Sequence, residues 1–388
     1  MLSITKDILY IGVNDHEIDL FEGQFPVRNG MAYNSYAIVD ERIAILDTVD
    51  IRFQEEWLGD IRKILGDKGS PDYLVVHHME PDHSGTILRF TQEYPKAQIV
   101  ASAKAFEMMK NFFGTEFKER QLVVKEGDEL TLGEHSLQFI TAPMVHWPEV
   151  IMSYDAKDQV FFSADAFGKF GALDVDEPWE EEARRYYIGI VGKYGLPVQT
   201  VLKKVSKWPI KMICSLHGPI LTGDLTHYLN LYQTWASYQP EEKGIVIAYA
   251  SIYGNTKAAA LTLEEMIKET YTGPVMTYDL TRCDHFQAIA DAFRYDTLIL
   301  ASSTYNGGVF PSMRYYIEGL MERNFSNHKV GLIENGSWAS ASGKEMRQML
   351  EKGKNLKIIE PTLLLTSKLN DDTRCQMKDF IDQMLEKS

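Results

Sequence analysis

The sequence predicts an α/β protein in two parts, an α/β sandwich followed by a doubly wound parallel sheet. Residues 1–240 contain many short apolar runs of strand length with helical patterns between them, which is typical of an α/β sandwich. Residues 245–388 instead alternate regularly between strand and helix, which is typical of a doubly wound parallel sheet. The difference between these two patterns predicts that the chain has two parts with different folds.

The first part consists of short strand patterns separated by helical patterns. We expect its strands at Met31–Val39, Ile43–Asp47, Tyr73–His77, Gln98–Ser102, Leu137–Thr141, Val150–Tyr154 and Val160–Ala164. We expect its helices near Glu55–Leu65, Thr86–Tyr94, Lys104–Phe113 and Pro197–Lys207. Several candidate functional residues follow directly after these strands.

A polar stretch at residues 238–244, which contains Pro240 and Gly244, separates the two parts. We therefore assign residues 1–240 to one domain and residues 245–388 to another. In the second domain the strands are expected at 245–250, 274–280, 297–303, 329–334 and 356–366. The helices are expected at 256–271, 285–295, 312–323, 342–352 and 373–386.

The composition is that of an ordinary globular protein with an acidic surface. The 388 residues are 45% hydrophobic and 24% charged, and the formal net charge is −15. Such a charge argues against a nucleic acid or an anionic membrane as a partner. No apolar run approaches the roughly 20 residues that are needed to cross a bilayer.

The cysteines indicate a reducing compartment. Cys214, Cys283 and Cys375 are far apart and form no C-x-x-C pair, so we expect free thiols and no iron–sulfur cluster. The N-terminus has no basic region followed by an apolar core, and no secretory signal is expected. These features favour a cytoplasmic protein.

Four potential metal ligands fall within six residues directly after the expected strand at 73–77. They are His78, Glu80, Asp82 and His83. Two imidazoles and two carboxylates this close together favour a bound cation, because a cation offsets the repulsion between the carboxylates. The alternative is a polar loop that is rich in these residue types and binds no metal.

Three further candidates, His146, Asp165 and His217, stand at strand–loop junctions farther along the chain. Ligands from separate strand ends can converge on one edge of a sheet, so all seven residues can form one tertiary metal site. The other histidines receive different roles. His77 is expected to pack in the core or behind the metal ligands, and the remaining ones are expected at the surface or in caps: His16, His135, His227, His285 and His328.

A second candidate site follows the strands of the second domain. The first loop offers hydroxyls, an amide and a glycine at a helix N-terminus, which suits one phosphate group but not a dinucleotide. Two later loops offer aromatic rings and glycines at the carboxyl ends of strands. Taken alone, each loop also fits an ordinary cap or surface packing. The candidate residues are Ser251, Ile252, Tyr253, Gly254, Asn255, Thr256, Ser303, Thr304, Tyr305, Asn306, Gly307, Gly308, Asn335, Gly336, Ser337 and Trp338.

The metal candidates resemble those of the metallo-β-lactamase fold, whose first motif is H-x-H-x-D-H. Glu80 stands in place of the second histidine, which makes this motif resemble that of the flavodiiron proteins. The resemblance implies two iron ions, each held by three side chains and joined by one bridging carboxylate. The implied ligands are His78, Glu80 and His146 for one iron, Asp82, His83 and His217 for the other, and Asp165 as the bridge.

Other residues of the first domain also take roles from this resemblance. Asp47 resembles a structural aspartate that orients the metal loop. In some family members the residue at the position of His83 does not contact the metal. A tyrosine near the metals is also implied, and the candidates are Tyr186, Tyr187 and Tyr194, although each also suits a core position.

The three loops of the second domain together resemble the FMN site of flavodoxin. A metallo-β-lactamase-like αβ/βα sandwich followed by a flavodoxin-like domain is the order found in flavodiiron proteins. The resemblance implies an enzyme that reduces O2 to water, NO to N2O, or both. FMN would pass electrons one at a time to the iron pair.

The resemblance also implies partners. Because no rubredoxin or flavin-reductase module follows Ser388, we expect a separate electron donor, either a small carrier such as rubredoxin or a reduced deazaflavin. The family brings flavin and metals together by head-to-tail pairing, so we expect a homodimer or a dimer of dimers.

Two other functions fit parts of the sequence. A lactamase-type hydrolase with a flavodoxin accessory domain would bind zinc and cleave esters, amides or thioesters, but Glu80 argues against it. An electron carrier with structural metals would keep its role in a redox chain after Asp165→Asn or His146→Asn.

Overall fold

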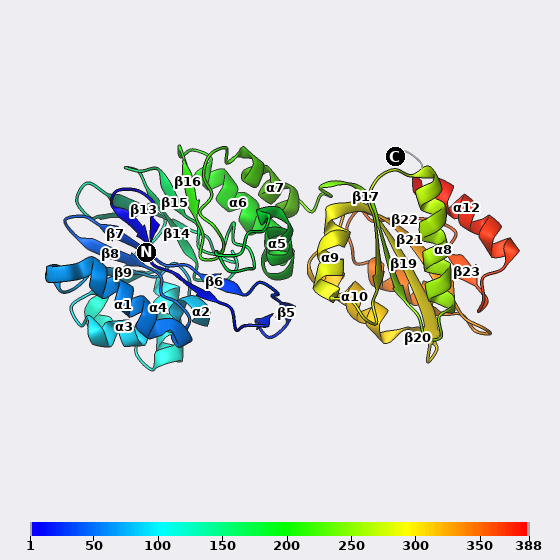
Figure 1. Cartoon of the computed structure of the whole chain (residues 1–388), viewed down its shortest axis with the longest axis horizontal. Helices are drawn as coiled ribbons and strands as arrows, with labels where there is room; N and C mark the ends of the chain where they lie inside the picture. Colours follow the sequence, from blue (N-terminus) through cyan, green and yellow to red (C-terminus); the bar gives the residue numbers. More distant parts are fainter. Residues whose placement is uncertain (1, 386–388) are drawn as a thin grey trace. The chain divides into compact units, whose positions relative to one another are not determined.

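The computed structural model describes residues 2–385 of the chain, which divides into two compact units between Gln233 and Thr234 (Figure 1). The division lies inside helix α7 (Thr226–Ala236), just before the polar stretch at 238–244. The last residues of that stretch already belong to a strand, because β17 (Glu242–Ala250) begins three residues earlier than the sequence pattern indicates.

The first unit contains two main sheets, of seven and five strands. The seven-stranded sheet has the order β1 (Leu2–Ser3), β2 (Ile8–Tyr10), β7 (Tyr36–Val39), β8 (Ile43–Leu46), β9 (Tyr73–Val75), β10 (Gln98–Ala101) and β11 (Gln121–Val123). The five-stranded sheet has the order β12 (Glu129–Thr131), β13 (Ser136–Thr141), β14 (Ile151–Asp155), β15 (Val160–Phe162) and β16 (Met212–Cys214). Two short strand pairs, β3 (Val13–Asp15) with β6 (Met31–Tyr33) and β4 (Leu20–Phe21) with β5 (Phe25–Pro26), complete the strands.

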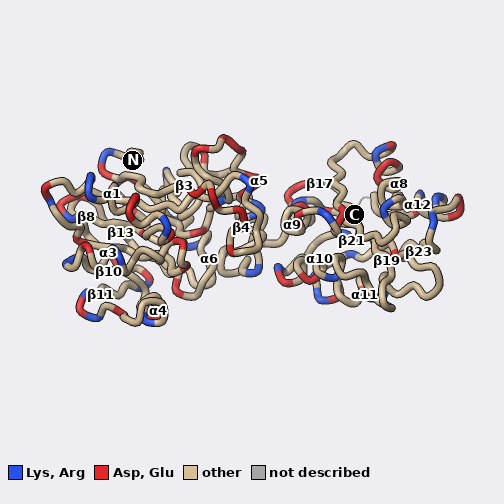
Figure 2. Tube along the Cα trace, turned by 60° about the horizontal axis from the view of Figure 1, so that its bottom comes forward, with Lys and Arg blue, Asp and Glu red and all other residues tan. Residues whose placement is uncertain are grey.

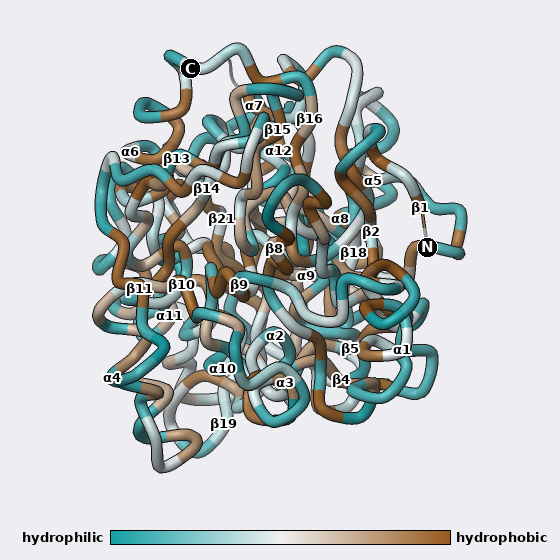
Figure 3. The backbone as a smooth tube through the Cα atoms, turned by 90° about the vertical axis from the view of Figure 1, so that its left-hand side faces the viewer, coloured by the Kyte–Doolittle hydropathy of each residue, from teal (hydrophilic) through white to brown (hydrophobic). Residues whose placement is uncertain are grey.

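One hydrophobic core joins the two main sheets. It combines Ile38, Leu46 and Val75 from the larger sheet with Phe139 and Phe162 from the smaller one, and all five are buried. Side chains alternate across a strand, so one face of each sheet supplies this core. Figure 3 shows brown hydrophobic segments alternating with teal hydrophilic ones along the trace. The predicted α/β sandwich is therefore confirmed.

Helices flank this sandwich. Figure 1 shows α1 (Gln54–Leu65), α2 (Pro81–Ser84), α3 (Ile87–Glu93) and α4 (Ala103–Phe113) together, and α5 (Trp179–Tyr186), α6 (Gly195–Val205) and α7 in a second group. The apolar residues of α1 recur at helical spacing and are buried, and the Trp57 indole donates to Ser35 Oγ at 2.9 Å. The sequence pattern did not indicate α2, α5 or α7.

One expected strand, Met31–Val39, is two strands in different sheets. The chain turns at Asn34, whose side-chain amide donates to the carbonyl oxygens of Ser215 and Gly218 at 2.9 and 2.8 Å. This side chain binds the loop that carries His217. The break in the strand therefore holds a candidate metal ligand in place.

The second unit is a parallel sheet of the flavodoxin type. Its strands are β17, β18 (Val275–Asp279), β19 (Tyr295–Tyr305), β21 (Lys329–Asn335), β22 (Lys357–Ile358) and β23 (Leu363–Leu365), with β20 (Gly308–Val309) folded back on β19. The order β18-β17-β19-β21-β22 is the 2-1-3-4-5 order of flavodoxin-like folds. The expected strand 356–366 is two short strands. Pro361 lies between them and has no N–H for a ladder hydrogen bond.

Helices cover both faces of this sheet, as predicted. Figure 1 shows α9 (His285–Arg294) and α10 (Pro311–Glu322) on one side and α8 (Asn255–Thr270) and α12 (Asp371–Leu385) on the other. Helix α11 (Ser342–Leu350) packs on β21 and α10. Ile247 and Ile299 of the strands pack with Leu263 of α8 and Met377 of α12 in a buried core.

Both units contain charged side chains and free cysteine thiols. Acidic and basic residues are interspersed along the trace of both units (Figure 2), and all three cysteines are free. Among residues 2–385, no helix combines the length and the apolar character that a membrane span requires.

Two histidines predicted at the surface or in caps are instead buried. His328 packs on Phe325 with ring centroids 4.3 Å apart. His135 Nδ1 lies 3.0 Å from Asp155 Oδ1, and its Nε2 lies 3.5 Å from Asp7 Oδ2. For His135 the prediction was wrong because these acidic partners are distant in the sequence. Burial by itself lowers the pKa of His135, but the hydrogen bond and charge of Asp155 outweigh burial and raise it.

The His135 cluster predicts a pH-dependent stability. Asp155 and Asp7 face the imidazole, Lys157 binds Asp7, and Asp40 accepts the His135 backbone N–H. Because the folded pKa is raised, protonation of His135 stabilises the fold below the unfolded pKa of about 6.5 and this contribution disappears as the pH rises through the folded pKa. His135→Gln should therefore lower the free energy of unfolding most at about pH 5 and least in alkaline buffer. Urea unfolding over this range measures the difference, and a difference that grows with pH would contradict the expectation.

Candidate metal centre and flavin pocket

The structure brings all seven predicted metal ligands together in the first unit. After β9, a loop and the short helix α2 carry His78, Glu80, Asp82 and His83, while the other three come from loops after β13, β15 and β16. Their potential ligand atoms form two groups, in each of which all the atoms lie within 4.8 Å of one another. The groups are His78, Glu80, His146 and Asp165, and Asp82, His83 and His217.

Asp165 lies between the two groups. Its Oδ2 is 3.0 Å from His146 Nε2 and 3.4 Å from His78 Nε2. Its Oδ1 is 3.6 Å from His83 Nε2 and 4.0 Å from His217 Nε2. One carboxylate oxygen thus faces each group, which is the arrangement that a bridging ligand requires.

The pocket has buried polar atoms that the protein alone does not satisfy. Both carboxylate oxygens of Asp82 and Asp165 Oδ1 are buried and have no hydrogen-bond partner within residues 2–385. His83 Nε2 and His217 Nε2 face each other at 2.9 Å. Buried polar atoms without partners are costly, and cations between these side chains would satisfy the oxygens and the ring nitrogens together. The seven residues therefore fit a pair of metal ions.

The charges in the pocket are strongly coupled. Burial acts to raise the pKa of Asp165, but the surrounding imidazoles outweigh burial and hold this pKa well below its usual value. Burial acts to lower the pKa of His146, but hydrogen bonds with Asp165 and Glu80 raise it to about 9. The pocket therefore favours ionised carboxylates, which are the form that binds metal.

Hydrogen bonds behind the ligands fix their orientation. Asp47 Oδ1 accepts the His77 N–H at 2.7 Å, and Asp47 Oδ2 lies 2.5 Å from His77 Nδ1. His77 is thus buried behind the metal loop. His217 Nδ1 lies 2.7 Å from the carbonyl oxygen of Ala32, and His78 Nδ1 lies 2.8 Å from Glu149 Oε1. His78 and His217 therefore present Nε2 to the pocket.

The sequence reasoning missed Glu149. It follows His146 by three residues, which placed an acid close to a candidate ligand, but its hydrogen bond goes to His78 on a different loop. That pairing depends on how the two sheets meet and is not visible in the spacing of either motif.

Of the predicted tyrosines, Tyr186 lies at the metal pocket. Its ring centroid lies 5.4 Å from that of His217, and its buried hydroxyl has no hydrogen-bond partner within residues 2–385. Tyr187 packs instead on Tyr232 with centroids 5.0 Å apart. Phe21 also lies on His217, at 5.5 Å. The aromatic rings shield this side of the pocket from water.

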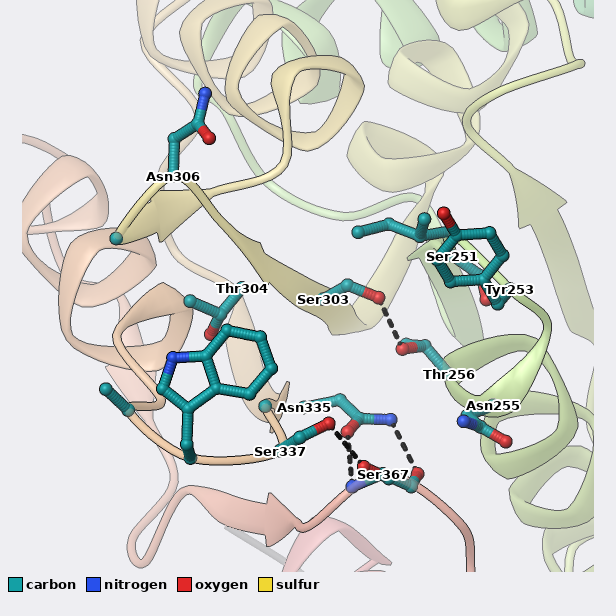
Figure 4. A pocket seen from close by; sticks show the side chains of 15 residues that line it. Ser251, Tyr253, Asn255, Thr256, Ser303, Thr304, Asn306, Asn335, Ser337 and Ser367 are labelled. Carbon is teal, nitrogen blue, oxygen red and sulfur yellow. Dashed lines mark hydrogen bonds between the residues drawn. The ribbon is translucent and has the colours of Figure 1, made fainter.

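A cavity of about 410 Å³ lies at the carboxyl ends of β17, β19 and β21 in the second unit (Figure 4). Its size is within the range of small-molecule sites. It is lined by Ser251, Ile252, Tyr253, Asn255, Thr256, Ser303, Thr304, Asn306, Gly307, Asn335, Gly336, Ser337, Trp338, Ala339 and Ser367. None of these lining residues carries a formal charge.

Three predicted residues do not line this cavity. Gly254 precedes α8 with φ +91°, a left-handed conformation that favours glycine, and its N–H donates to Ser251 Oγ at 3.1 Å. Tyr305 packs on Phe310 with centroids 5.6 Å apart. A Cβ on Gly308 would lie 2.3 Å from Glu345 Oε2. These residues shape the loops around the cavity.

Ala339 and Ser367 line the cavity but were not predicted. The Ser367 N–H donates to Asn335 Oδ1 at 3.0 Å, and Asn335 Nδ2 donates to the Ser367 carbonyl oxygen at 2.9 Å (Figure 4). This pair joins the loops after β21 and β23. Ser367 escaped prediction because it follows the fifth strand, where the sequence shows no glycine or aromatic residue.

The cavity offers neutral donors for a phosphate and exposed rings for a flat group. Thr256 Oγ1 and Ser303 Oγ lie 2.8 Å apart beside the first turn of α8, where unpaired backbone N–H groups and the helix dipole favour an anion (Figure 4). Tyr253 is 94% exposed and Trp338 is 92% exposed. Both are free to pack on a flat ring.

Comparison with known proteins finds similarity in the first unit and along most of the chain. A family model described as ODP family beta lactamase matches residues 31–218. The chain is 27% identical over 362 residues to an anaerobic nitric oxide reductase flavorubredoxin of Salmonella arizonae, which covers 90% of this chain and 74% of that protein.

Two solved structures have the same fold along nearly the whole chain. The rubredoxin oxygen:oxidoreductase of Desulfovibrio gigas is 24% identical with a TM-score of 0.91, and the match covers 98% of this chain and 97% of that one. The flavodiiron protein of Giardia intestinalis is 24% identical with a TM-score of 0.87, and the match covers 98% and 95%.

The flavin pocket predicts the effect of one hydroxyl group. Thr256→Val should raise the dissociation constant for FMN by about 10–100-fold, because a hydrogen bond to a charged group contributes about 1.5–3 kcal/mol. Thr270→Val at the opposite end of α8 is the matched control, since its hydroxyl lies outside the cavity and faces Ile267. Titration of the flavin-free protein with FMN at fixed salt measures both. Equal affinities of the Thr256 variant and the unmodified protein would show that the Thr256 hydroxyl does not bind the phosphate.

Proposed function

Because the chain belongs to the flavodiiron proteins, we propose that it is an oxidoreductase that reduces O2 to water, NO to N2O, or both. The observation that carries this proposal is the cluster of seven buried imidazoles and carboxylates in two adjoining groups. A relative named as a nitric oxide reductase and a structural neighbour named as an oxygen oxidoreductase support both gases as substrates.

The ligand set suits two iron ions. His78, Glu80 and His146 would hold one iron, Asp82, His83 and His217 the other, and Asp165 would contact both. A mixture of imidazole nitrogens and carboxylate oxygens is suitable for iron, and Glu80 adds a hard anionic ligand. When bound, the iron pair supplies electrons and open coordination positions for a diatomic gas.

The second unit would bind FMN. Its cavity has a cradle for one phosphate and no cationic side chain, which fits a flavin mononucleotide held by neutral donors and a helix N-terminus. FMN exchanges electrons singly or in pairs and can therefore link a donor to the iron pair. In this proposal residues 1–240 are the diiron domain and residues 245–388 are the FMN domain.

The protein supplies orientation and shielding. Asp47, Glu149 and the Ala32 carbonyl group fix the loop and the imidazoles, so that the ligand atoms face the pocket. The Tyr186 hydroxyl is buried beside His217 and is available to hydrogen-bond a gas molecule. Phe21 and Trp147 limit the access of water.

The proposed partners are a separate electron donor and a second copy of this chain. The donor would be a small carrier of the rubredoxin type or a reduced deazaflavin, and the protein would act in the cytoplasm. Exposed Tyr253 and Trp338 beside the flavin pocket support a head-to-tail homodimer or a dimer of dimers, since large exposed rings at a site favour contact with another surface.

Tyr186→Phe tests the gas pocket. Loss of the hydroxyl should lower the gas reduction rate about tenfold, which corresponds to one hydrogen bond of about 1.4 kcal/mol. The free energy of unfolding should stay the same or rise slightly, because this buried hydroxyl has no partner within residues 2–385. Tyr187→Phe is the control and should keep the rate, since Tyr187 packs on Tyr232. Stopped-flow kinetics measures the rates; equal rates for all three proteins would exclude a role of Tyr186 in turnover.

The proposed function is tested under anaerobic conditions. The protein is loaded with iron and FMN, reduced chemically and mixed with O2 or NO while flavin oxidation, gas loss and iron content are followed. We expect rapid flavin oxidation with at least one gas, and only slow oxidation for the zinc-loaded protein and for Asp165→Asn. An iron-replete protein that consumes neither gas would overturn the proposal, and flavin-independent ester cleavage by the zinc form would favour the hydrolase.

A further inference from the structure

The imidazoles of the metal pocket are supported by different groups on the side away from the metals. His78 Nδ1 lies 2.8 Å from the carboxylate of Glu149, whereas His217 Nδ1 lies 2.7 Å from the backbone carbonyl oxygen of Ala32. His83 Nδ1 is buried and has no hydrogen-bond partner within residues 2–385. The three imidazoles therefore differ in their support. His78 has a carboxylate, His217 has a neutral carbonyl group, and His83 Nδ1 has no hydrogen-bond partner within residues 2–385.

Glu149 is held firmly at its position. It is only 2% exposed, and its Oε1 also accepts the Met79 N–H at 2.9 Å. Its backbone carbonyl oxygen accepts the Ser102 hydroxyl at 2.7 Å. Because backbone and side chain are both fixed, Glu149 constrains the ring of His78 and contributes a buried negative charge behind that ring.

The two metal positions have similar ligands of their own, two imidazoles and one carboxylate each. Asp165 faces both positions, with its oxygens 3.0 and 3.4 Å from imidazoles of the first and 3.6 and 4.0 Å from those of the second. The two positions differ in the groups that lie behind their imidazoles, at Nδ1. A carboxylate that accepts the N–H of a metal-binding imidazole raises the basicity of that ligand, and removal of such a partner typically lowers metal affinity 10–100-fold.

We propose that Glu149 is a positioning residue that makes the two metal positions unequal. The position of His78, Glu80 and His146 binds a divalent metal more tightly than the position of Asp82, His83 and His217. This inference deepens the proposed function, since it concerns the same iron site, but it is tested by metal binding without any gas.

The experiment titrates the full-length metal-free protein with Fe²⁺ under anaerobic conditions in the presence of a competing chelator. The unmodified protein should bind two equivalents in two steps whose dissociation constants differ about tenfold or more. Glu149→Gln should weaken the tighter step about 10–100-fold and leave the weaker step unchanged. Glu149→Asp keeps the charge and should retain more of the tighter binding than Glu149→Gln.

Two further variants assign the steps. Asp82→Asn removes a ligand of the weaker position and should leave the tighter step intact. Asp291→Asn removes a buried carboxylate of the second unit that accepts the Tyr278 hydroxyl and belongs to no candidate metal group, and it should leave both steps unchanged. This control separates the effect of Glu149 from a general loss of a buried carboxylate.

The outcomes are distinct. Two equal steps in the unmodified protein, or loss of the tighter step in Asp82→Asn, would overturn the inference while the proposed function stands. If Glu149→Gln does not fold, the unmodified protein and Asp82→Asn still test whether the two positions are unequal, and a tighter step of unchanged affinity in Glu149→Asp would contradict the role of Glu149. Fewer than two bound iron equivalents in the unmodified protein would overturn both the inference and the proposed function.

Discussion

The first unit is organised around one electrostatic constraint, the burial of three carboxylates among four imidazoles. Such groups are stable in the interior only if each is paired with opposite charge or binds a cation. Asp165 and Asp82 both lie beside imidazoles, yet the two buried oxygens of Asp82 have no hydrogen-bond partner within residues 2–385. The pocket therefore needs cations to satisfy all of its buried polar atoms, and contacts from the surrounding loops fix the positions of the ligand side chains.

The sandwich meets this constraint by joining loops that are distant in sequence. Asn34 links the break between β6 and β7 to the His217 loop, while Asp47 links the end of β8 to the loop after β9. Each contact is made by backbone or by a short side chain, which permits little movement. The second unit solves a different problem with neutral groups, because its cavity has no charged lining and relies on hydroxyls and the first turn of α8.

Local patterns in the sequence were sufficient for the features that depend on neighbouring residues. The run from His78 to His83 and the alternation of strands and helices in the second unit both belong to this class. Features that depend on contacts between distant parts of the chain could not be predicted from the sequence. Glu149 meets His78 across two loops, His135 is buried because Asp155 and Asp7 approach it, and Tyr305 turns toward Phe310 instead of the cavity.

The most direct test of the account is the location of iron in crystals of the anaerobically iron-loaded protein, by anomalous X-ray scattering at the iron absorption edge. The account predicts two neighbouring peaks within the seven-residue pocket, one on each side of Asp165. A single peak, or iron bound only outside this pocket, would contradict it.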